Sequence, residues 1–184
     1  MPTLQGKLDT VKAAGSRAAP MNIFATSSSP ERSARALDDR RVIKMAVESA
    51  QLLSTAMWQR GLDPPYRPTH VAHPAVRWTG ATQGNYRWVL RHFEALVAEY
   101  HRRFGGVHAS SRWSTRFGSA RGDFPRGRRG PFVNLSSHPR VVPTTEAYRR
   151  RLREKWRHSD RSPRWTRSQM PRWAKPLRRI KSAD

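Results

Sequence analysis

Residues 29–60, SPERSARALDDRRVIKMAVESAQLLSTAMWQR, decide the fold. Their apolar side chains recur at steps of three and four, the spacing that gathers them on one face of an α-helix. Ser29 suits the N-cap, Pro30 the first helical position and Gly61 the stop. Asp38 and Asp39 are expected to be exposed helix or cap residues, near a break between a short helix and a long one. The apolar face is predicted to contain Val42, Ala46, Ala50, Leu53 and Met57, widened by Ile43 and Val47.

Two further helices are predicted, over residues 82–104 and over residues 144–158. Gly105 is expected to end the first of them. The proline-rich residues 62–74 and the Gly, Arg and Pro-rich residues 107–143 are expected to be loops, the second partly mobile. The fold class is therefore all-α, a compact helical domain with two long amphipathic helices, long loops and a basic C-terminal tail.

The expected domain organisation has three parts. Residues 1–20 are an N-terminal extension, for which three interpretations stay open: a start assigned too early, a disordered arm, or a transit peptide for organelle import. Residues 21–158 form the helical domain, and residues 159–184 form a basic tail with tryptophan and proline.

The charge of the chain points to a polyanionic partner. Lys and Arg number 36 against 13 Asp and Glu, and residues 149–184 alone hold 14 basic against 3 acidic residues. Nucleic acid is the commonest such partner, with DNA favoured over RNA, and an anionic membrane surface is the lesser alternative. No apolar run approaches the roughly 20 residues of a membrane-spanning helix. We therefore expect a soluble, monomeric protein of the cytoplasm, associated with the nucleoid if bacterial.

Several classes of chemistry find no support in the sequence. The chain has no cysteine, which excludes disulfides, thiolate nucleophiles and cysteine-ligated metals. No glycine-rich nucleotide-binding motif and no GxSxG motif is present, so no cofactor is expected. His70 and His73 have HxxH spacing, but further ligands are scarce, and no metal site is predicted. His73, just before Pro74, is expected to hydrogen-bond to the backbone or to face a phosphate.

Basic and aromatic residues alternate in the tail, where Pro-Arg-Trp occurs at residues 163–165 and 171–173. Guanidinium groups bind phosphates and indoles stack on exposed bases, so the pattern is typical of nucleic-acid binding. Alternatively, the indoles fold back onto the helical core. The predicted nucleic-acid-binding residues are Arg40, Arg41, Lys44, His70, His73, Arg77, Arg164, Trp165, Arg172 and Trp173.

Glu48 is the acidic residue whose position suggests chemistry. It lies at the edge of the apolar face of residues 39–60, where a half-buried carboxylate could exchange protons with a substrate. The alternative is a structural ion pair with Lys44 or Arg41.

Five segments together resemble small phage and bacterial proteins that we associate with the pyrimidine-dimer DNA glycosylases of the endonuclease V type. These segments are MNIF (21–24), LDDRRVIKMAVESAQLLSTA (37–56), PTHVAHPAVRW (68–78), NYRWVLRHFEALVAEYHRRFGGVH (85–108) and AYRRRLREKW (147–156). The link to the glycosylases themselves is a glutamate nine residues after an aspartate, here Asp39 and Glu48.

The resemblance implies a compact helical enzyme in which the first residue's α-amine forms a Schiff base with C1′ of the sugar. It also implies that Glu48 assists base loss and strand cleavage. The amine would belong to the mature chain's first residue, Met21 or Asn22, and Lys44 is an alternative. The chain departs from the family pattern in two ways. Twenty residues precede Met21, and the arginines that flank the family's glutamate are replaced by Val47 and Gln51.

Two functions are weighed against each other: a glycosylase and abasic-site lyase, with Glu48 and Asn22 as catalytic residues, and a non-catalytic, ribosome- or nucleoid-associated nucleic-acid-binding protein. A base-modifying enzyme on the same scaffold is a third possibility.

Overall fold

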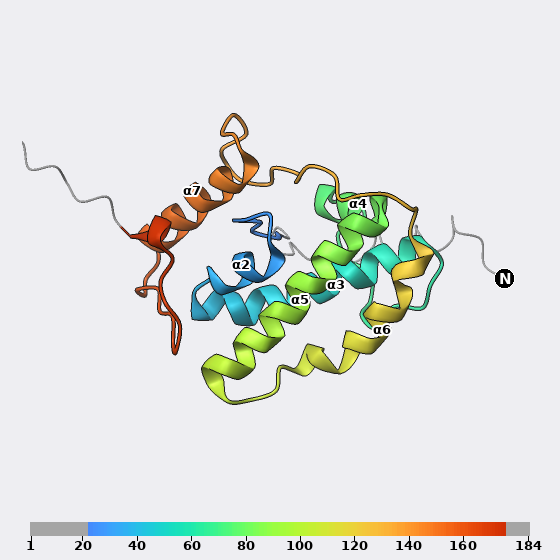
Figure 1. The fold of residues 1–184 in the computed structure, drawn as a ribbon, viewed down its shortest axis with the longest axis horizontal. Helices are drawn as coiled ribbons and strands as arrows, with labels where there is room; N and C mark the ends of the chain where they lie inside the picture. The colour runs from blue at the N-terminus through green and yellow to red at the C-terminus, as the bar shows by residue number, and fades with distance from the viewer. Residues whose placement is uncertain (1–21, 176–184) are drawn as a thin grey trace, which may run out of the picture.

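The computed structural model describes residues 22–175, which form helices and connecting segments without a β-strand (Figure 1). The all-α prediction is confirmed. The predicted extension over residues 1–20, together with Met21 and residues 176–184, lies outside the described residues. The α-helices are α2 (Pro30–Arg35), α3 (Asp39–Gln59), α4 (Pro74–Ala81), α5 (Gln83–Phe104), α6 (Ser114–Ser119) and α7 (Thr144–Arg157), and the 3₁₀ turns are η1 (Ala109–Trp113), η2 (Ala120–Asp123) and η3 (Arg172–Ala174).

The predicted start of α2 and the break before α3 are both present. The Ser29 hydroxyl accepts a hydrogen bond from the Arg32 N–H at 3.1 Å, and Pro30 opens the helix. Asp38 occupies the N-cap position of α3. The prediction that Asp38 is exposed was wrong: its side chain is buried, because its carboxylate accepts from the Trp156 indole at 2.9 Å and pairs with Arg41 at 2.8 Å.

Helix α5 lies obliquely across α3, and the two long helices bury each other's apolar faces (Figure 1). The five residues predicted for the apolar face of α3 are all buried, whereas Ile43 is 43% exposed. The buried face extends instead to the other side of the five, where Met45, Leu52 and Ala56 are buried. Gly105 ends α5 in the left-handed conformation, with φ 73°. Among residues 22–175, no helix combines the length and the apolar character needed to cross a membrane.

The segment after α5 is more ordered than predicted. Residues 109–123 form η1, α6 and η2, and Phe117 and Phe124 are buried anchors. The following residues run back over the start of α5, where Gly84 donates to the Gly127 carbonyl at 3.1 Å. A Cβ on Gly84 would lie 2.2 Å from the Arg129 backbone nitrogen, so this close approach requires glycine.

Helix α7 is attached to the rest of the molecule at both ends. Near its start, Tyr148 packs edge-to-face on Phe24, and Arg149 donates to the Thr26 carbonyl at 3.0 Å. Near its end, the Trp156 indole donates to Asp38, a contact between residues 118 positions apart. These contacts fix α7 above the N-terminal part of α3.

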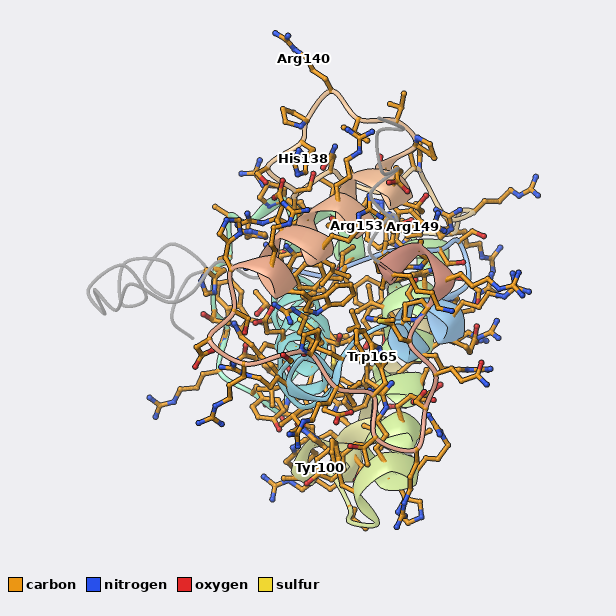
Figure 2. The ribbon with its side chains drawn as sticks, turned by 90° about the vertical axis from the view of Figure 1, so that its left-hand side faces the viewer. Tyr100, His138, Arg140, Arg149, Arg153 and Trp165 are labelled. Carbon is orange, nitrogen blue, oxygen red and sulfur yellow. The ribbon has the colours of Figure 1, made fainter. Side chains whose placement is uncertain are left out.

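The chain after α7 returns along α2 and α3. The Trp165 indole donates to the Ala36 carbonyl at 3.2 Å, and Figure 2 shows Trp165 against the helical body. Trp165 and Trp173 both pack on Trp156, Trp165 edge-to-face and Trp173 stacked. Arg140, in contrast, extends away from the body at the tip of the loop before α7 (Figure 2).

Candidate active site

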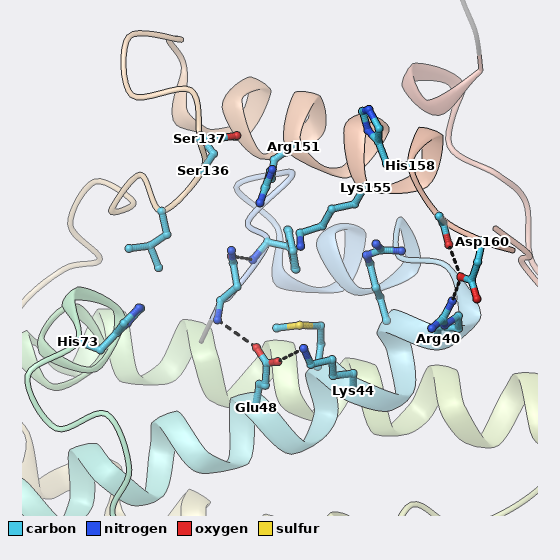
Figure 3. Close-up of a pocket in the computed structure, with 16 residues that line it drawn as sticks. Arg40, Lys44, Glu48, His73, Ser136, Ser137, Arg151, Lys155, His158 and Asp160 are labelled. Carbon is cyan, nitrogen blue, oxygen red and sulfur yellow. Dashed lines mark hydrogen bonds and ion pairs between the residues drawn. The ribbon is translucent and has the colours of Figure 1, made fainter. Parts of the chain in front are cut away.

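A cavity of about 860 Å³ lies between α3 and α7 (Figure 3). Helix α3 forms its floor, the N-terminal segment and the start of α4 form one side, and α7 with the loops on either side of it forms the roof. The lining residues are Asn22, Phe24, Arg40, Arg41, Lys44, Met45, Glu48, His73, Leu135, Ser136, Ser137, Arg151, Lys155, His158, Ser159 and Asp160.

Glu48 lies on the floor of this cavity, with 8% of its surface exposed. Its Oε2 accepts a hydrogen bond from the backbone nitrogen of Asn22 at 3.0 Å, and its Oε1 lies 3.1 Å from Lys44 Nζ. The structure thus brings together the two predicted catalytic residues, 26 positions apart in sequence. Of the two alternative ion-pair partners, the structure selects Lys44, because Arg41 pairs with Asp38 instead.

The side chain of Asn22 fixes the backbone around this contact. Its Oδ1 accepts from the N–H groups of Ile23 and Phe24, at 2.8 and 3.0 Å. Ile23 and Ala25 are fully buried in the core. The extended segment therefore holds the Asn22 nitrogen at the carboxylate, where an amine or an amide donor can contact Glu48.

Five basic side chains line the cavity, three from α3 and two from α7: Arg40, Arg41, Lys44, Arg151 and Lys155. Arg40 pairs with Asp160 at 3.0 Å on the exposed rim. The pKa of Lys155 lies below its ordinary value, chiefly because burial penalises the charged ammonium, and because the positive charges of Arg151, Arg41 and Lys44 oppose it. This excess of positive charge suits an anionic ligand.

His73 begins α4, and its Nδ1 accepts from the Ala75 N–H at 3.2 Å. The predicted bond from His73 to the backbone is confirmed. Burial and the neighbouring His70 lower the pKa of His73, which favours the neutral ring that this bond requires. His70 does not line the cavity; its Nδ1 lies 2.9 Å from the Thr69 hydroxyl.

The remaining predicted nucleic-acid-binding residues lie apart from this cavity. Arg77, Arg164 and Arg172 are exposed, and the indoles of Trp165 and Trp173 are half-buried against Trp156. The packing alternative for these indoles is thus present in the structure, and their contact with nucleic acid stays a prediction. Within residues 22–175, no group of three or more His, Asp or Glu side chains is arranged to hold a metal ion.

The sequence did not predict that Arg151 and Lys155 of α7 line the cavity. Arg151 and Lys155 are one turn apart on α7, beside the buried stripe of Tyr148, Leu152 and Trp156. Their spacing marks them as neighbours on one helix face. Nothing in their spacing indicates that this face opposes Glu48.

Comparison with known proteins places the chain in a family. The family model described as "Pyrimidine dimer DNA glycosylase" matches residues 21–114, just over half of the chain. The match includes Asn22, Lys44 and Glu48 but ends before α7. No curated protein and no solved structure gives a significant match to the chain.

Proposed function

Because the chain belongs to the pyrimidine dimer DNA glycosylase family, we propose that the cavity above Glu48 is the active site of a DNA glycosylase and abasic-site lyase. The substrate would be DNA with a damaged or modified base, and the reaction would proceed through a Schiff base. The observation that carries the proposal is the 3.0 Å contact between the Asn22 nitrogen and the Glu48 carboxylate inside a cavity rich in positive charge.

The reaction needs an amine at C1′ of the deoxyribose. In a chain that begins at Asn22, its nitrogen would be an α-amine, with an ordinary pKa of about 8 and a substantial neutral fraction at neutral pH. Attack on C1′ breaks the bond to the base, which leaves with the bonding electron pair and takes the proton that the amine loses. Opening of the sugar ring at O4′ then gives the imine.

Glu48 would act as the acid and base of this reaction. As a carboxylate it stabilises the protonated imine and removes a proton from C2′. The C3′–O bond then breaks, a C2′–C3′ double bond forms, and the 3′ phosphate leaves. Water hydrolyses the imine and frees the amine.

The basic side chains around the cavity would bind the DNA backbone. Arg40 lies on the exposed rim, and Arg151 projects from the roof, so both can contact phosphates beside an extruded nucleotide (Figure 3). The cavity between α3 and α7 would receive that nucleotide, since chemistry at C1′ requires it to leave the helical stack.

The test is strand cleavage and borohydride trapping on a duplex with one abasic site, using the full chain and a form released from a cleavable fusion so that Asn22 is its first residue. We expect a trapped adduct with the form that begins at Asn22. Glu48→Gln keeps an acceptor for the Asn22 nitrogen but removes the base, so strand cleavage should fall by about 100-fold or more.

The matched control is Glu94→Gln, on the exposed surface of α5, which should cleave like the parent chain. Cleavage by Glu48→Gln at the parent rate would refute the proposed role of Glu48. DNA binding without any adduct or cleavage, in both forms, would leave the non-catalytic nucleic-acid-binding function instead.

A further inference from the structure

The cavity contains a second nitrogen suited to imine formation. In any chain in which residues precede Asn22, its nitrogen is a peptide amide and cannot form an imine. Two primary amines, on Lys44 and Lys155, line the same cavity. Resting on the function proposed above, we propose that Lys155 on α7 supplies the amine that forms the Schiff base with C1′ in the full chain.

The position of Lys155 carries the proposal. Figure 3 shows its side chain extending from α7 into the cavity, toward the floor that holds Glu48. Helix α7 is fixed on each side of this residue, by the contacts of Tyr148 and Arg149 with the N-terminal segment and by the Trp156 indole on Asp38. The amine is therefore held across the cavity from the proposed base.

Lys44 is less suited to the same role. Its ammonium forms the 3.1 Å ion pair with Glu48, and its side chain is 60% exposed. The ion pair directs this nitrogen at the Glu48 carboxylate rather than at a substrate carbon. Lys155 is half-buried, and among the described residues no carboxylate lies within 4.0 Å of its ammonium nitrogen.

The surroundings of Lys155 favour its neutral form. Burial lowers the pKa of Lys155 most; the positive charges of Arg151 on its own helix and of Arg41 and Lys44 on α3 lower it further, while Glu48 acts in the opposite direction. Arg40, His73, His158 and Asp160 are the other charged or titratable groups of the cavity. Desolvation and cationic neighbours are the means by which lysines are made nucleophilic near neutral pH.

The proposed step balances without a further reactant. Neutral Nζ adds to C1′ of an abasic sugar in its aldehyde form, and the carbinolamine loses the former aldehyde oxygen as water. The resulting imine is protonated. Glu48 takes the C2′ proton, the C3′–O bond breaks, and the 3′ phosphate leaves with the electron pair of that bond.

The experiment traps the imine of the full chain with borohydride on an abasic duplex and locates the reduced adduct by proteolysis and mass spectrometry. We expect the adduct on the peptide that contains Lys155. Lys155→Arg keeps the positive charge but cannot form the imine, so adduct yield should fall at least about tenfold. Lys175→Arg is the matched control, at an exposed lysine that does not line the cavity, and it should retain the adduct.

A pH profile separates a nucleophile from a phosphate contact. Arg151→Gln removes a positive charge beside Lys155 and raises its pKa, so the rise of trapping rate with pH should move to higher pH. A profile that does not move would argue against the proposal, because only a reacting amine links this charge to the rate of imine formation.

The outcomes distinguish this proposal from the one on which it rests. An adduct on another residue, or an undiminished adduct with Lys155→Arg, overturns the role of Lys155 and leaves the glycosylase function intact. An adduct obtained from the form beginning at Asn22 but not from the full chain also overturns the role of Lys155 and leaves the glycosylase function intact. Absence of adduct and cleavage from both forms overturns both proposals.

Discussion

His92 gives the fold a measurable sensitivity to acid. Its side chain is fully buried in α5, where the ring stacks on Trp88 and Nδ1 donates to the Pro30 carbonyl at 3.1 Å. Its Nε2 has no hydrogen-bond partner among residues 22–175. A proton on Nε2 would place an unpaired charge in the core, and burial therefore lowers the pKa of His92 to about 4, against weaker opposing effects of Pro30 and Glu31.

The sign of the effect follows from proton uptake. A histidine in the unfolded chain has a pKa near 6.5, so it binds a proton below that pH. Folded His92 binds its proton only when the pH falls to about 4. The free energy of unfolding must fall across this window as the pH is lowered. Between pH 7.5 and 4.5 the loss from His92 amounts to about 2–3 kcal/mol.

Urea unfolding of the parent chain and of His92→Gln at both pH values measures this loss. The glutamine amide can still donate to Pro30 but does not titrate, so the variant should lose about 2–3 kcal/mol less than the parent on acidification. His101→Gln, on the exposed face of α5, is the control and should keep the parental loss. Equal losses for His92→Gln and the parent would refute the reasoning.

Two further predictions concern the ionic contacts and the tail. Arg103 is fully buried and donates to Glu99 at 3.0 Å. Arg103→Met leaves the Glu99 carboxylate buried without this partner and should lower the free energy of unfolding in urea by about 3–5 kcal/mol. Arg102→Met removes a partly exposed partner of Glu99 and should lower it by less than about 1 kcal/mol. Equal costs would refute this. If the exposed arginines of the tail contact phosphates, Arg164→Gln and Arg172→Gln should each reduce the slope of log affinity for DNA against log salt by about 0.9, and unchanged slopes would exclude these contacts.

The helices could be predicted because their signals are local. Ser29, Thr82 and Gly105 act within one turn of the helix ends that they mark, and each has the role expected of its residue type. The edge position of Glu48 follows from the same periodicity. The contact of Glu48 with the Asn22 nitrogen does not follow from it, because residues 26 positions apart meet through tertiary packing. The family resemblance named both as catalytic residues without predicting this contact.

The errors have the opposite origin. Asp38 was expected to be exposed because a charged residue at a helix start usually is, and it is buried because Trp156, 118 positions later, covers it. The position of Lys155 in the cavity was missed for a similar reason. Periodicity places it on the polar face of α7, but a polar face facing solvent and a polar face facing another helix have the same pattern.

The position of the Asn22 nitrogen depends on the residues that follow it. Ile23 and Ala25 are buried in the core, Phe24 packs on Tyr148, and the Thr26 carbonyl accepts from Arg149. Each of these contacts is formed by side chains or backbone after Asn22. We therefore expect the nitrogen to stay at Glu48 whether it carries a peptide bond or two amine hydrogens. Under the two proposals, the same geometry would use an α-amine in one form of the chain and Lys155 in another.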